Sequence, residues 1–388
     1  MGVRIGAAAI GLAALAGVSC YPKNFPPPTA KASFAKDFPF DIGPYLVYVE
    51  GGRIDVVVGH DALETPPVVA WQTGTSTSAE STKVTSTSVD GLWVAQLTEL
   101  PLDVPLTYTV ESELGTVGPI PFHGGRSPRR RFRFAAFGDT RTGHKVHRAL
   151  IENMAKENVD LVVHSGDLVE SGGVLDQWVE FFSIEAPVIA SAPLIAALGN
   201  HDLSQRNHYK RFILAKRYAD DQRYFYRDWG DVRVIIMDSE EESRAGSAQY
   251  EFLESAMRDG AEKDMFMIVA LHRPPYSAGA HGSDLEMREI LGELCPRFGV
   301  EVVLAGHDHN YERTKRIDGV TYFVAASGGA PIRRMNPSWF SEVVRTEPHY
   351  VIFDVERRSL VGRAINLDGD TFDTFVIPPL DPQPPKKP

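Results

Sequence analysis

The most informative stretch of this chain is the apolar run Val302-Val303-Leu304-Ala305, followed at once by Gly306-His307-Asp308-His309-Asn310. The run is typical of a short buried strand, so it delivers the polar pentad to a strand end. Two imidazoles two positions apart would face opposite sides of a strand. They can serve one site only if the chain turns there, which Gly306 permits. A polar loop would also explain the pentad taken alone, so its meaning depends on the other strand ends.

The composition is that of an ordinary globular protein. At 388 residues, with 43% hydrophobic and 23% charged residues, the chain is long enough for a sizeable core and two domains. Acidic residues outnumber basic ones, 51 against 40, which gives a formal charge of −11. The sequence contains no basic block interleaved with aromatic residues, and Arg129-Arg130-Arg131 is interpreted as a solvated linker, so we expect no nucleic-acid partner.

Residues 1–20 are typical of a signal peptide. Arg4 precedes an apolar run from Ile5 to Val18, and these 14 residues fall short of the ~20 that a transmembrane helix needs. The end of the segment, Gly17-Val18-Ser19-Cys20, resembles a bacterial lipobox, although that pattern prefers leucine where Gly17 stands. We expect an exported, periplasmic or cell-surface protein, with lipid anchoring at Cys20 favoured over ordinary cleavage.

The second cysteine of the chain, Cys295, supports that preference. An exported protein rarely keeps two unpaired thiols, and acylation of Cys20 would account for one of them and attach the protein to a membrane. A disulfide between Cys20 and Cys295 is the alternative, but it would link the N-terminal tail covalently to the predicted core of the protein. The Pro-rich residues 21–40 are interpreted as an extended tether.

Residues 41–125 are predicted to form a small all-β sandwich, because short strand-like runs alternate with turn residues. The clearest runs are Tyr45–Val49, Val68–Trp71, Leu92–Ala95 and Leu106–Val110.

From residue 131 the pattern changes to apolar strands alternating with helical segments, which is typical of an α/β layered domain. The predicted strands are Phe132–Phe137, Leu161–His164, Leu194–Leu198, Val232–Met237, Met265–Leu271 and Val302–Ala305. The predicted helices are Lys145–Glu157, Gln177–Ile189, Gln249–Met257 and Asp284–Phe298. Strand-like alternation over residues 350–377 completes a second predicted domain of residues 131–377, and residues 378–388 are expected to be a disordered tail.

Five of the six predicted strands end in a polar cluster. The clusters are Gly138-Asp139-Thr140-Arg141, Gly166-Asp167, Gly199-Asn200-His201-Asp202, His272-Arg273-Pro274 and Gly306-His307-Asp308-His309. In α/β sheets ligands collect at the carboxyl edge of the strands, so these clusters can converge. Carboxylates, an amide and imidazoles without thiolates favour a divalent or trivalent metal. Two metal ions that share a carboxylate would relieve the repulsion between packed carboxylates, and Asp167 is the natural bridge.

The order of these clusters resembles the calcineurin-like metallophosphoesterase superfamily, and within it the purple acid phosphatase-like branch. The motifs of that branch are present here as Gly138-Asp139, Gly166-Asp167, Gly199-Asn200-His201, His272-Arg273-Pro274-Pro275-Tyr276-Ser277 and Gly306-His307-Asp308-His309-Asn310-Tyr311-Glu312-Arg313. The resemblance implies an N-terminal all-β fibronectin-like sandwich, which Gly43-Pro44-Tyr45 would open, followed by an α/β four-layer αββα metallophosphoesterase domain.

The resemblance also implies a dinuclear metal site and its ligands. One metal would be held by Asp139, Asp167 and His309, and the second by Asp167, Asn200, His272 and His307. Two metal ions per chain are expected, drawn from iron, zinc and manganese. His201 would contact the phosphate or help to protonate the leaving oxygen, and His281, nine residues after His272, would be a further substrate-binding or acid histidine.

Two residues depart from the family pattern. Glu170 stands where purple enzymes carry the tyrosine that colours them, so this protein should not be purple. Arg141 stands where many superfamily members have the histidine of an Asp-x-His motif, which leaves the first metal without an obvious fourth ligand. Glu170 or His144 could complete that shell, although a surface or supporting role suits each better. Arg141 could instead clamp a phosphate oxygen with its planar fork.

The expected function is therefore hydrolysis of phosphate monoesters outside the cytoplasm, on a phosphorylated small-molecule or lipid substrate. A phosphodiesterase acting on nucleotides or phospholipid headgroups is the nearest alternative, because the same site can perform both reactions. A surface-anchored binding protein with a vestigial metal site is the alternative of a different class.

Overall fold

The computed structural model describes residues 38–74, 81–205, 207–214, 223–356 and 359–383. The predicted signal peptide, the lipobox with Cys20 and most of the predicted tether lie outside these residues. Within the described residues, no helix has both the length and the apolar character needed to cross a membrane. Cys295 is buried and unpaired among the described residues.

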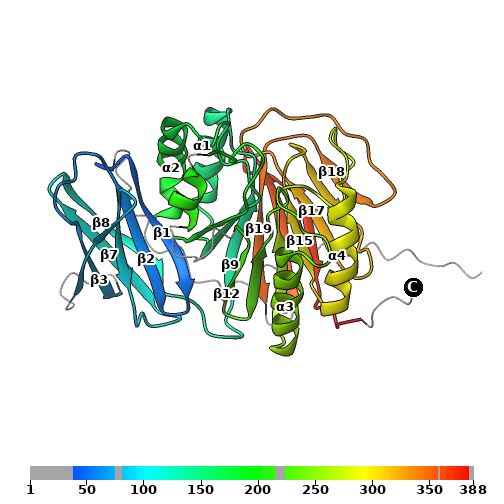
Figure 1. The fold of residues 1–388 in the computed structure, drawn as a ribbon, viewed down its shortest axis with the longest axis horizontal. Helices are drawn as coiled ribbons and strands as arrows, with labels where there is room; N and C mark the ends of the chain where they lie inside the picture. The colour runs from blue at the N-terminus through cyan, green and yellow to red at the C-terminus, as the bar shows by residue number, and fades with distance from the viewer. Residues whose placement is uncertain (1–37, 75–80, 206, 215–222, 357–358, 384–388) are drawn as a thin grey trace, which may run out of the picture. The chain divides into compact units, whose positions relative to one another are not determined.

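The N-terminal region folds into two four-stranded antiparallel sheets, which agrees with the all-β character predicted for residues 41–125 (Figure 1). One sheet has the order β1-β2-β6-β5 and the other β4-β3-β7-β8. The strands are β1 Ile42–Glu50, β2 Arg53–Gly59, β3 Val68–Thr73, β4 Thr82–Thr85, β5 Thr87–Val89, β6 Leu92–Leu97, β7 Pro105–Ser112 and β8 Gly115–His123. The finer fibronectin-like classification stays a prediction.

Two tyrosines of the β region form hydrogen bonds to the backbone of the α/β region. The hydroxyl of Tyr45 donates to the carbonyl of Phe212, and that of Tyr108 to the carbonyl of Ala190, both at 2.7 Å. Each ring is buried, so each hydroxyl needs such a partner. The β region and the α/β region therefore share one continuous core.

The α/β region contains a six-stranded and a seven-stranded sheet. Their orders are β11-β10-β9-β19-β20-β21 and β12-β13-β14-β15-β17-β16-β18. The strands are β9 Phe132–Phe137, β10 Leu161–His164, β11 Leu194–Ala196, β12 Phe225–Trp229, β13 Val232–Ile236, β14 Phe266–Ala270, β15 Val302–Ala305, β16 Tyr311–Thr314, β17 Thr321–Ala325, β18 Ser341–Arg345, β19 His349–Glu356, β20 Ser359–Asn366 and β21 Thr371–Ile377. All six strands predicted from the sequence are present as β9, β10, β11, β13, β14 and β15.

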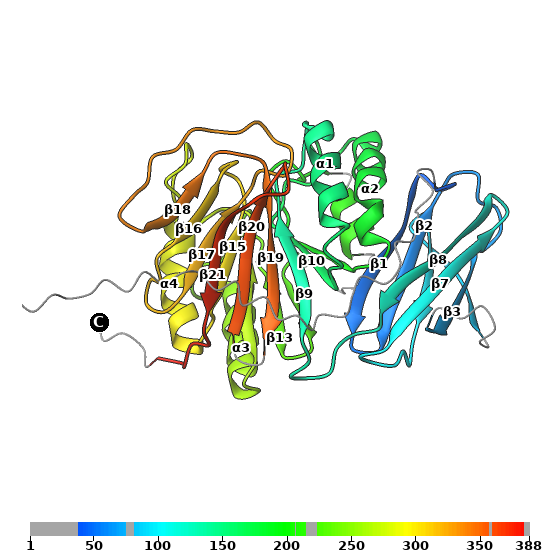
Figure 2. The same cartoon turned by 180° about the vertical axis from the view of Figure 1, so that it is seen from behind.

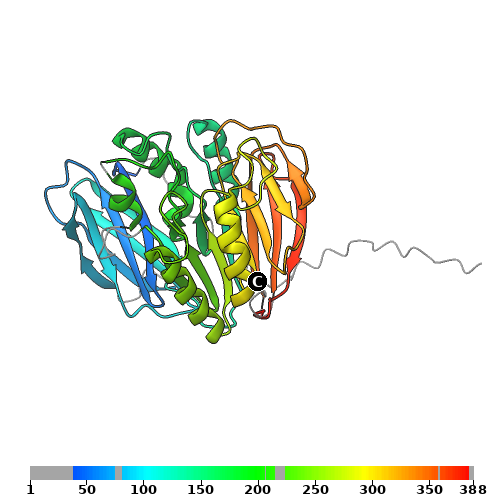
Figure 3. The same cartoon turned by 45° about the vertical axis from the view of Figure 1, so that its right-hand side comes forward.

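Four helices accompany these sheets: α1 His144–Met154, α2 Leu175–Ile189, α3 Ala248–Glu262 and α4 Leu285–Phe298. A π-helical turn, η1, spans Lys210–Leu214. Helices α3 and α4 lie against the seven-stranded sheet (Figure 3). Ser247 caps α3, since its hydroxyl accepts the N–H of Tyr250 at 3.2 Å, and Asp284 caps α4 through the N–H of Met287 at 3.0 Å.

Two helix ends differ from the prediction. Helix α1 ends at Met154, three residues before Glu157. Helix α3 continues to Glu262 rather than stopping at Met257. The polar residues after Met257 look like a helix end, but Gly260 is buried, and a Cβ there would lie 2.4 Å from Met267 Sδ. The glycine lets the last turn of α3 pack closely on β14.

The two sheets of the α/β region contact each other through aromatic side chains and through the loops at their strand ends. Phe323 of β17 packs edge-on against Phe353 of β19, with ring centroids 5.7 Å apart. Figure 2 shows β19 beside β9, followed by β20 and β21 in the same sheet. Beyond β17, the N–H of Gly328 donates to the carbonyl of Gly138 at 2.9 Å, and that of Ala330 to Asp139 at 2.8 Å. The four-layer αββα classification stays a prediction.

The predicted disordered tail, residues 378–388, is described as far as residue 383, and this part is held in place. The N–H of Leu380 donates to Glu301 Oε1 at 3.2 Å, and that of Gln383 to the carbonyl of Pro296 at 2.9 Å. The Pro and Lys content suggested disorder, but these long-range hydrogen bonds fix the first half of the tail.

Candidate metal centre

All six predicted metal ligands lie in loops that follow the carboxyl ends of strands. Asp139 follows β9, Asp167 follows β10 and Asn200 follows β11, all parallel neighbours in the six-stranded sheet. His272 follows β14, and His307 and His309 follow β15, which are parallel neighbours in the other sheet. Parallel strands end at a common edge, so two sheet edges supply one site.

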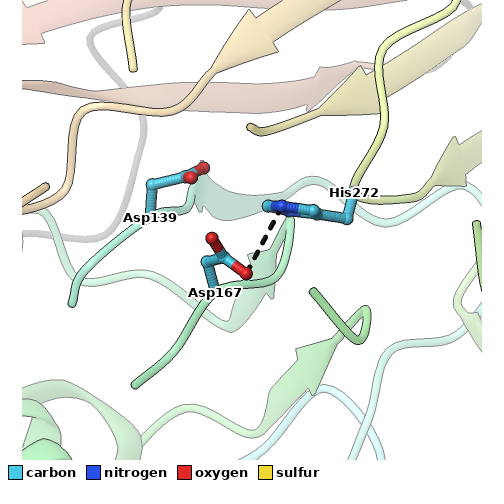
Figure 4. Close-up of side chains that lie close together, drawn as sticks. All are labelled: Asp139, Asp167 and His272. Atoms are coloured by element: carbon cyan, nitrogen blue, oxygen red, sulfur yellow. Dashed lines mark ion pairs between the residues drawn. The ribbon is translucent and has the colours of Figure 1, made fainter. Parts of the chain in front are cut away.

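Three buried side chains form the centre of the site. Asp139, Asp167 and His272 each offer one ligand atom, and these atoms all lie within 4.8 Å of one another (Figure 4). The dashed line in Figure 4 joins His272 Nε2 and Asp167 Oδ1, which are 3.4 Å apart. The two sheets thus bring together a carboxylate pair and an imidazole, as the sequence predicted.

The protonation of His272 makes this arrangement suitable for a cation. Its Nδ1 lies 2.9 Å from the carbonyl of Ser165. A carbonyl oxygen only accepts hydrogen bonds, so Nδ1 carries the proton and Nε2 presents a lone pair. That lone pair faces Asn200 Oδ1 at 3.1 Å and Asp167 Oδ1 at 3.4 Å, and His307 Nδ1 lies 3.2 Å away. The residues predicted to hold the second metal, Asp167, Asn200, His272 and His307, are called the second-metal pocket below, and they fit a metal ion.

His309 is fixed in the same way on the opposite side of the site. Its Nδ1 lies 2.8 Å from the carbonyl of Pro331, so its Nε2 presents a lone pair. Asp139 Oδ1 lies 3.3 Å from that nitrogen and has no hydrogen-bond partner within the described residues. The predicted ligands Asp139, Asp167 and His309 are called the first-metal pocket below. Their two carboxylates need a positive charge that none of the three side chains supplies.

The backbone of the site is strained at the ligands themselves. Asp139, Asp167, His307 and His309 all have positive φ, between 48° and 74°. Such conformations are unfavourable for residues other than glycine and cluster at functional sites. Of the glycines expected to turn the chain, Gly166 does so with a φ of 93°, whereas Gly306 serves close approach instead. A Cβ at Gly306 would lie 2.6 Å from Asp139 Oδ2.

Buried carboxylates brace the loops that carry the predicted ligands, and Asp202 is one of them. Asp202 accepts the N–H groups of Asp167 and Gly199 at 2.9 Å and of Val169 at 3.2 Å. Burial, and then the charge of Asp167, raise the pKa of Asp202 well above its ordinary value.

Two further buried carboxylates, for which the sequence predicted no bracing role, lie within the last motif. Asp308 accepts the N–H of His281 at 2.7 Å and the hydroxyl of Ser277. Glu312 accepts the N–H of Ala278 at 2.8 Å. Both hold the loop that follows His272. Asp308 lies between His307 and His309, and Glu312 follows them. Polar residues inside a ligand motif need partners of their own, so these positions could have indicated the bracing role.

The two predicted substrate histidines lie beside the ligands. His201 Nδ1 lies 2.8 Å from the carbonyl of Glu170, so it carries a proton, while Nε2 lies 4.0 Å from Asp167 Oδ2. The ring of His281 stacks on that of His307 with centroids 4.3 Å apart. Desolvation, followed by the charge of Arg333, lowers the pKa of His281. Desolvation, followed by the charge of His272, lowers the pKa of His307 to about 2.

Arg141 lies inside the first-metal pocket. Its Nε is 3.3 Å from Asp167 Oδ2 and its Nη2 is 3.4 Å from His309 Nε2, while Nη1 donates to Glu170. The residue is only 9% exposed. A guanidinium stays protonated in proteins, so the first-metal pocket already contains a positive charge and does not fit a metal ion in this arrangement.

The other residue considered for the first metal, His144, lies away from these ligands. Its ring is half-exposed, and its Nδ1 faces Glu180 at 3.7 Å. A cavity of about 280 Å³ opens between it and Arg141. The cavity is lined by Thr140, Arg141, Thr142, His144, His147, Leu168, Val169, Glu170, Gln177, Phe181 and Ile184.

Comparison with known proteins agrees with this geometry. Residues 132–311 match the family model for the calcineurin-like phosphoesterase. A nucleotide pyrophosphatase/phosphodiesterase from Hordeum vulgare is 27% identical over 59% of this chain and 74% of its own length. Two proteins of Arabidopsis thaliana also match: probable purple acid phosphatase 20, 27% identical over 50% of this chain, and probable inactive purple acid phosphatase 24, 30% identical over 57%. The chain spans less than half the length of these two Arabidopsis relatives, 49% and 43%.

Solved structures share the fold. A purple acid phosphatase from yellow lupin seeds superimposes with a TM-score of 0.73 at 20% identity, over 86% of this chain and 74% of its own. The structure of PhoD gives a TM-score of 0.67 at 12% identity, over 89% and 90% of the two chains. At these identities the likeness concerns the fold alone.

Proposed function

Because this chain belongs to the calcineurin-like phosphoesterase superfamily, in its purple acid phosphatase-like branch, we propose that it is a metal-dependent hydrolase of phosphate monoesters. The observation that carries the proposal is the second-metal pocket. There, Asp167 Oδ1 and Asn200 Oδ1 face the lone pair of His272 Nε2 at 3.4 and 3.1 Å. Buried polar groups without a partner are costly, and a metal ion is the partner that suits this carboxylate, amide oxygen and imidazole together.

The proposal gives each residue a role. A metal ion held by Asp167, Asn200, His272 and His307 would supply a Lewis acid that neutralises phosphoryl oxygens and acidifies a water for in-line attack. His201 keeps its Nδ1 proton on the carbonyl of Glu170, so its Nε2 can take a second proton. We assign it the general acid that protonates the departing alkoxide. We assign His281, stacked on His307, a contact with the substrate.

The predicted set of six ligands would hold two ions of iron, zinc or manganese if both pockets accepted one. The second-metal pocket suits this proposal as it stands. The first-metal pocket suits it only if Arg141 leaves the space between Asp167 and His309. The absence of the tyrosine that Glu170 replaces supports the expectation that the protein is not purple.

A second candidate is hydrolysis of phosphodiesters or pyrophosphates of nucleotides. It is favoured by the barley relative, whose name is nucleotide pyrophosphatase/phosphodiesterase and most of whose length this chain spans. A binding protein with a vestigial site is the remaining alternative, which the name of the inactive Arabidopsis relative supports. The convergent acceptors of the second-metal pocket favour the enzyme over the binding protein.

We also propose that the protein is exported and anchored through Cys20, both of which rest on the N-terminal sequence. Cell fractionation of the full-length chain and of Cys20→Ser tests this proposal. We expect the wild-type protein in the membrane fraction and the variant in the soluble exported fraction. Equal distribution of the two would contradict lipid anchoring.

The enzymatic proposal is tested with His307→Ala and Asn200→Ala on 4-nitrophenyl phosphate and bis(4-nitrophenyl) phosphate. Each variant should lose at least about a hundredfold in kcat/KM, since even residues that only support a metal ligand cost 10- to 100-fold. His60→Ala, on the surface of the β region, is the control and should keep full activity. Unchanged turnover in both ligand variants would refute the proposal, and preference for the diester would favour the second candidate.

A further inference from the structure

The two residues that depart from the family pattern contact each other. Arg141 stands in place of a histidine and Glu170 in place of a tyrosine, and 29 positions separate them in the chain. In the structure the Arg141 guanidinium donates to the Glu170 carboxylate. Both departures therefore lie together at the first-metal pocket.

The guanidinium makes the contacts that a metal ion would otherwise make. Its Nε lies 3.3 Å from Asp167 Oδ2, and its Nη2 lies 3.4 Å from His309 Nε2. The Nδ1 of His309 faces the carbonyl of Pro331 at 2.8 Å, which directs Nε2 to the guanidinium. The side chain of Arg141 therefore supplies positive charge to two of the three predicted ligands of the first metal.

Burial and backbone hydrogen bonds hold Arg141 at this position. It is 9% exposed, and its backbone is held by the loop, since its carbonyl accepts the N–H of Gly143 at 2.9 Å and the hydroxyl of Thr142 at 2.7 Å. A metal ion bound to Asp167 Oδ2 and His309 Nε2 at the usual ~2.0–2.2 Å would lie next to a guanidinium that cannot give up its charge. The two cations would repel each other in a buried site.

We propose that the Arg141–Glu170 pair replaces the first metal, so that the chain binds a single metal ion, in the second-metal pocket. Arg141 then provides a fixed positive charge across the site from that ion, and it lines the 280 Å³ cavity together with Glu170. This inference rests on the proposed function, because it specifies how many metal ions the proposed hydrolase carries and which residues hold them.

The test is the metal content of the full chain after equilibration with Mn²⁺ or Zn²⁺ and removal of free ions, measured by plasma mass spectrometry. We expect one ion per chain in the wild type and two in the double variant Arg141→His, Glu170→Tyr. Two ions in the wild type, or one in the double variant, would overturn the inference while leaving the proposed function standing. No bound ion in the wild type would overturn both.

A second pair of variants identifies the pocket and remains informative if the double variant does not fold. His307→Ala should lose the ion, whereas His309→Ala, two residues away, should retain one. If His309→Ala lost the ion and His307→Ala kept it, the metal would lie in the first-metal pocket and the inference would fail. Electron paramagnetic resonance of the Mn²⁺ form gives an independent readout. We expect the six-line signal of an isolated ion, and the signal of a coupled pair of ions would refute the single-metal inference.

Discussion

Replacement of Asp202 by alanine should loosen the two loops that carry Asp167 and Asn200. The Asp202 carboxylate is buried and accepts three backbone N–H groups, from Asp167, Val169 and Gly199. Alanine leaves all three donors without this partner. At about 1–3 kcal/mol for each buried group left unsatisfied, the free energy of unfolding should fall by at least about 3 kcal/mol.

Replacement of Asp202 by asparagine should reduce the free energy of unfolding less than replacement by alanine. Asp202 Oδ2 accepts two of the three N–H groups, those of Asp167 and Gly199. An amide oxygen placed there keeps both bonds, while the amide nitrogen loses only the bond to Val169. The free energy of unfolding of Asp202→Asn should therefore fall by only about 1–3 kcal/mol.

Urea unfolding followed by the fluorescence of the buried Trp178 and Trp229 measures these differences. The expected order of stability is wild type, then Asp202→Asn, then Asp202→Ala, with the exposed Asp61→Ala equal to the wild type. Equal stability of the two Asp202 variants would refute the bond-by-bond reasoning. An Asp202→Ala protein as stable as the wild type would show that the carboxylate does not brace the loops.

Two further predictions concern a glycine at the site and a buried acid away from it. Gly306→Ala should lower metal content and activity, because its Cβ would press on Asp139 Oδ2, which accepts the N–H of the metal ligand His307 at 2.9 Å. Gly292→Ala, with open space around its Cα in helix α4, should leave both unchanged and raise stability by up to about 1 kcal/mol. Burial raises the pKa of Glu301 to about 8. The folded state thus holds a proton that the unfolded state releases, and stability should fall by on the order of 1.4 kcal/mol per unit as the pH rises from 5 to 8. Urea unfolding at several pH values should show a weaker slope for Glu301→Gln, and identical slopes would contradict the assignment.

The sequence was sufficient to predict the strands that build the site. A short run such as Val302–Ala305 is apolar throughout, as a strand buried on both faces must be, and this is why its bounds matched. Convergence of Asp139, Asp167 and His272 was also predictable, because parallel strands end at a shared edge.

What the sequence did not reveal depends on contacts between loops. The contact of Arg141 with Glu170 depends on the paths of the loops after β9 and β10 beyond their first residues, and no local pattern encodes those paths. The same holds for Asp308, whose partners Ser277 and His281 come from the loop after β14. Identifying a residue in a motif is therefore easier than assigning its role, since the role is set by residues distant in the chain.

Charge balance connects these contacts to the number of metals. The carboxylates that line the two pockets or contact Arg141 are those of Asp139, Asp167 and Glu170. Arg141 and one divalent ion together neutralise these three negative charges, whereas a second divalent ion would leave an excess of two positive charges. Buried charges are tolerated when they are paired, so the presence of Arg141 makes a single divalent ion the electrically balanced state of this site.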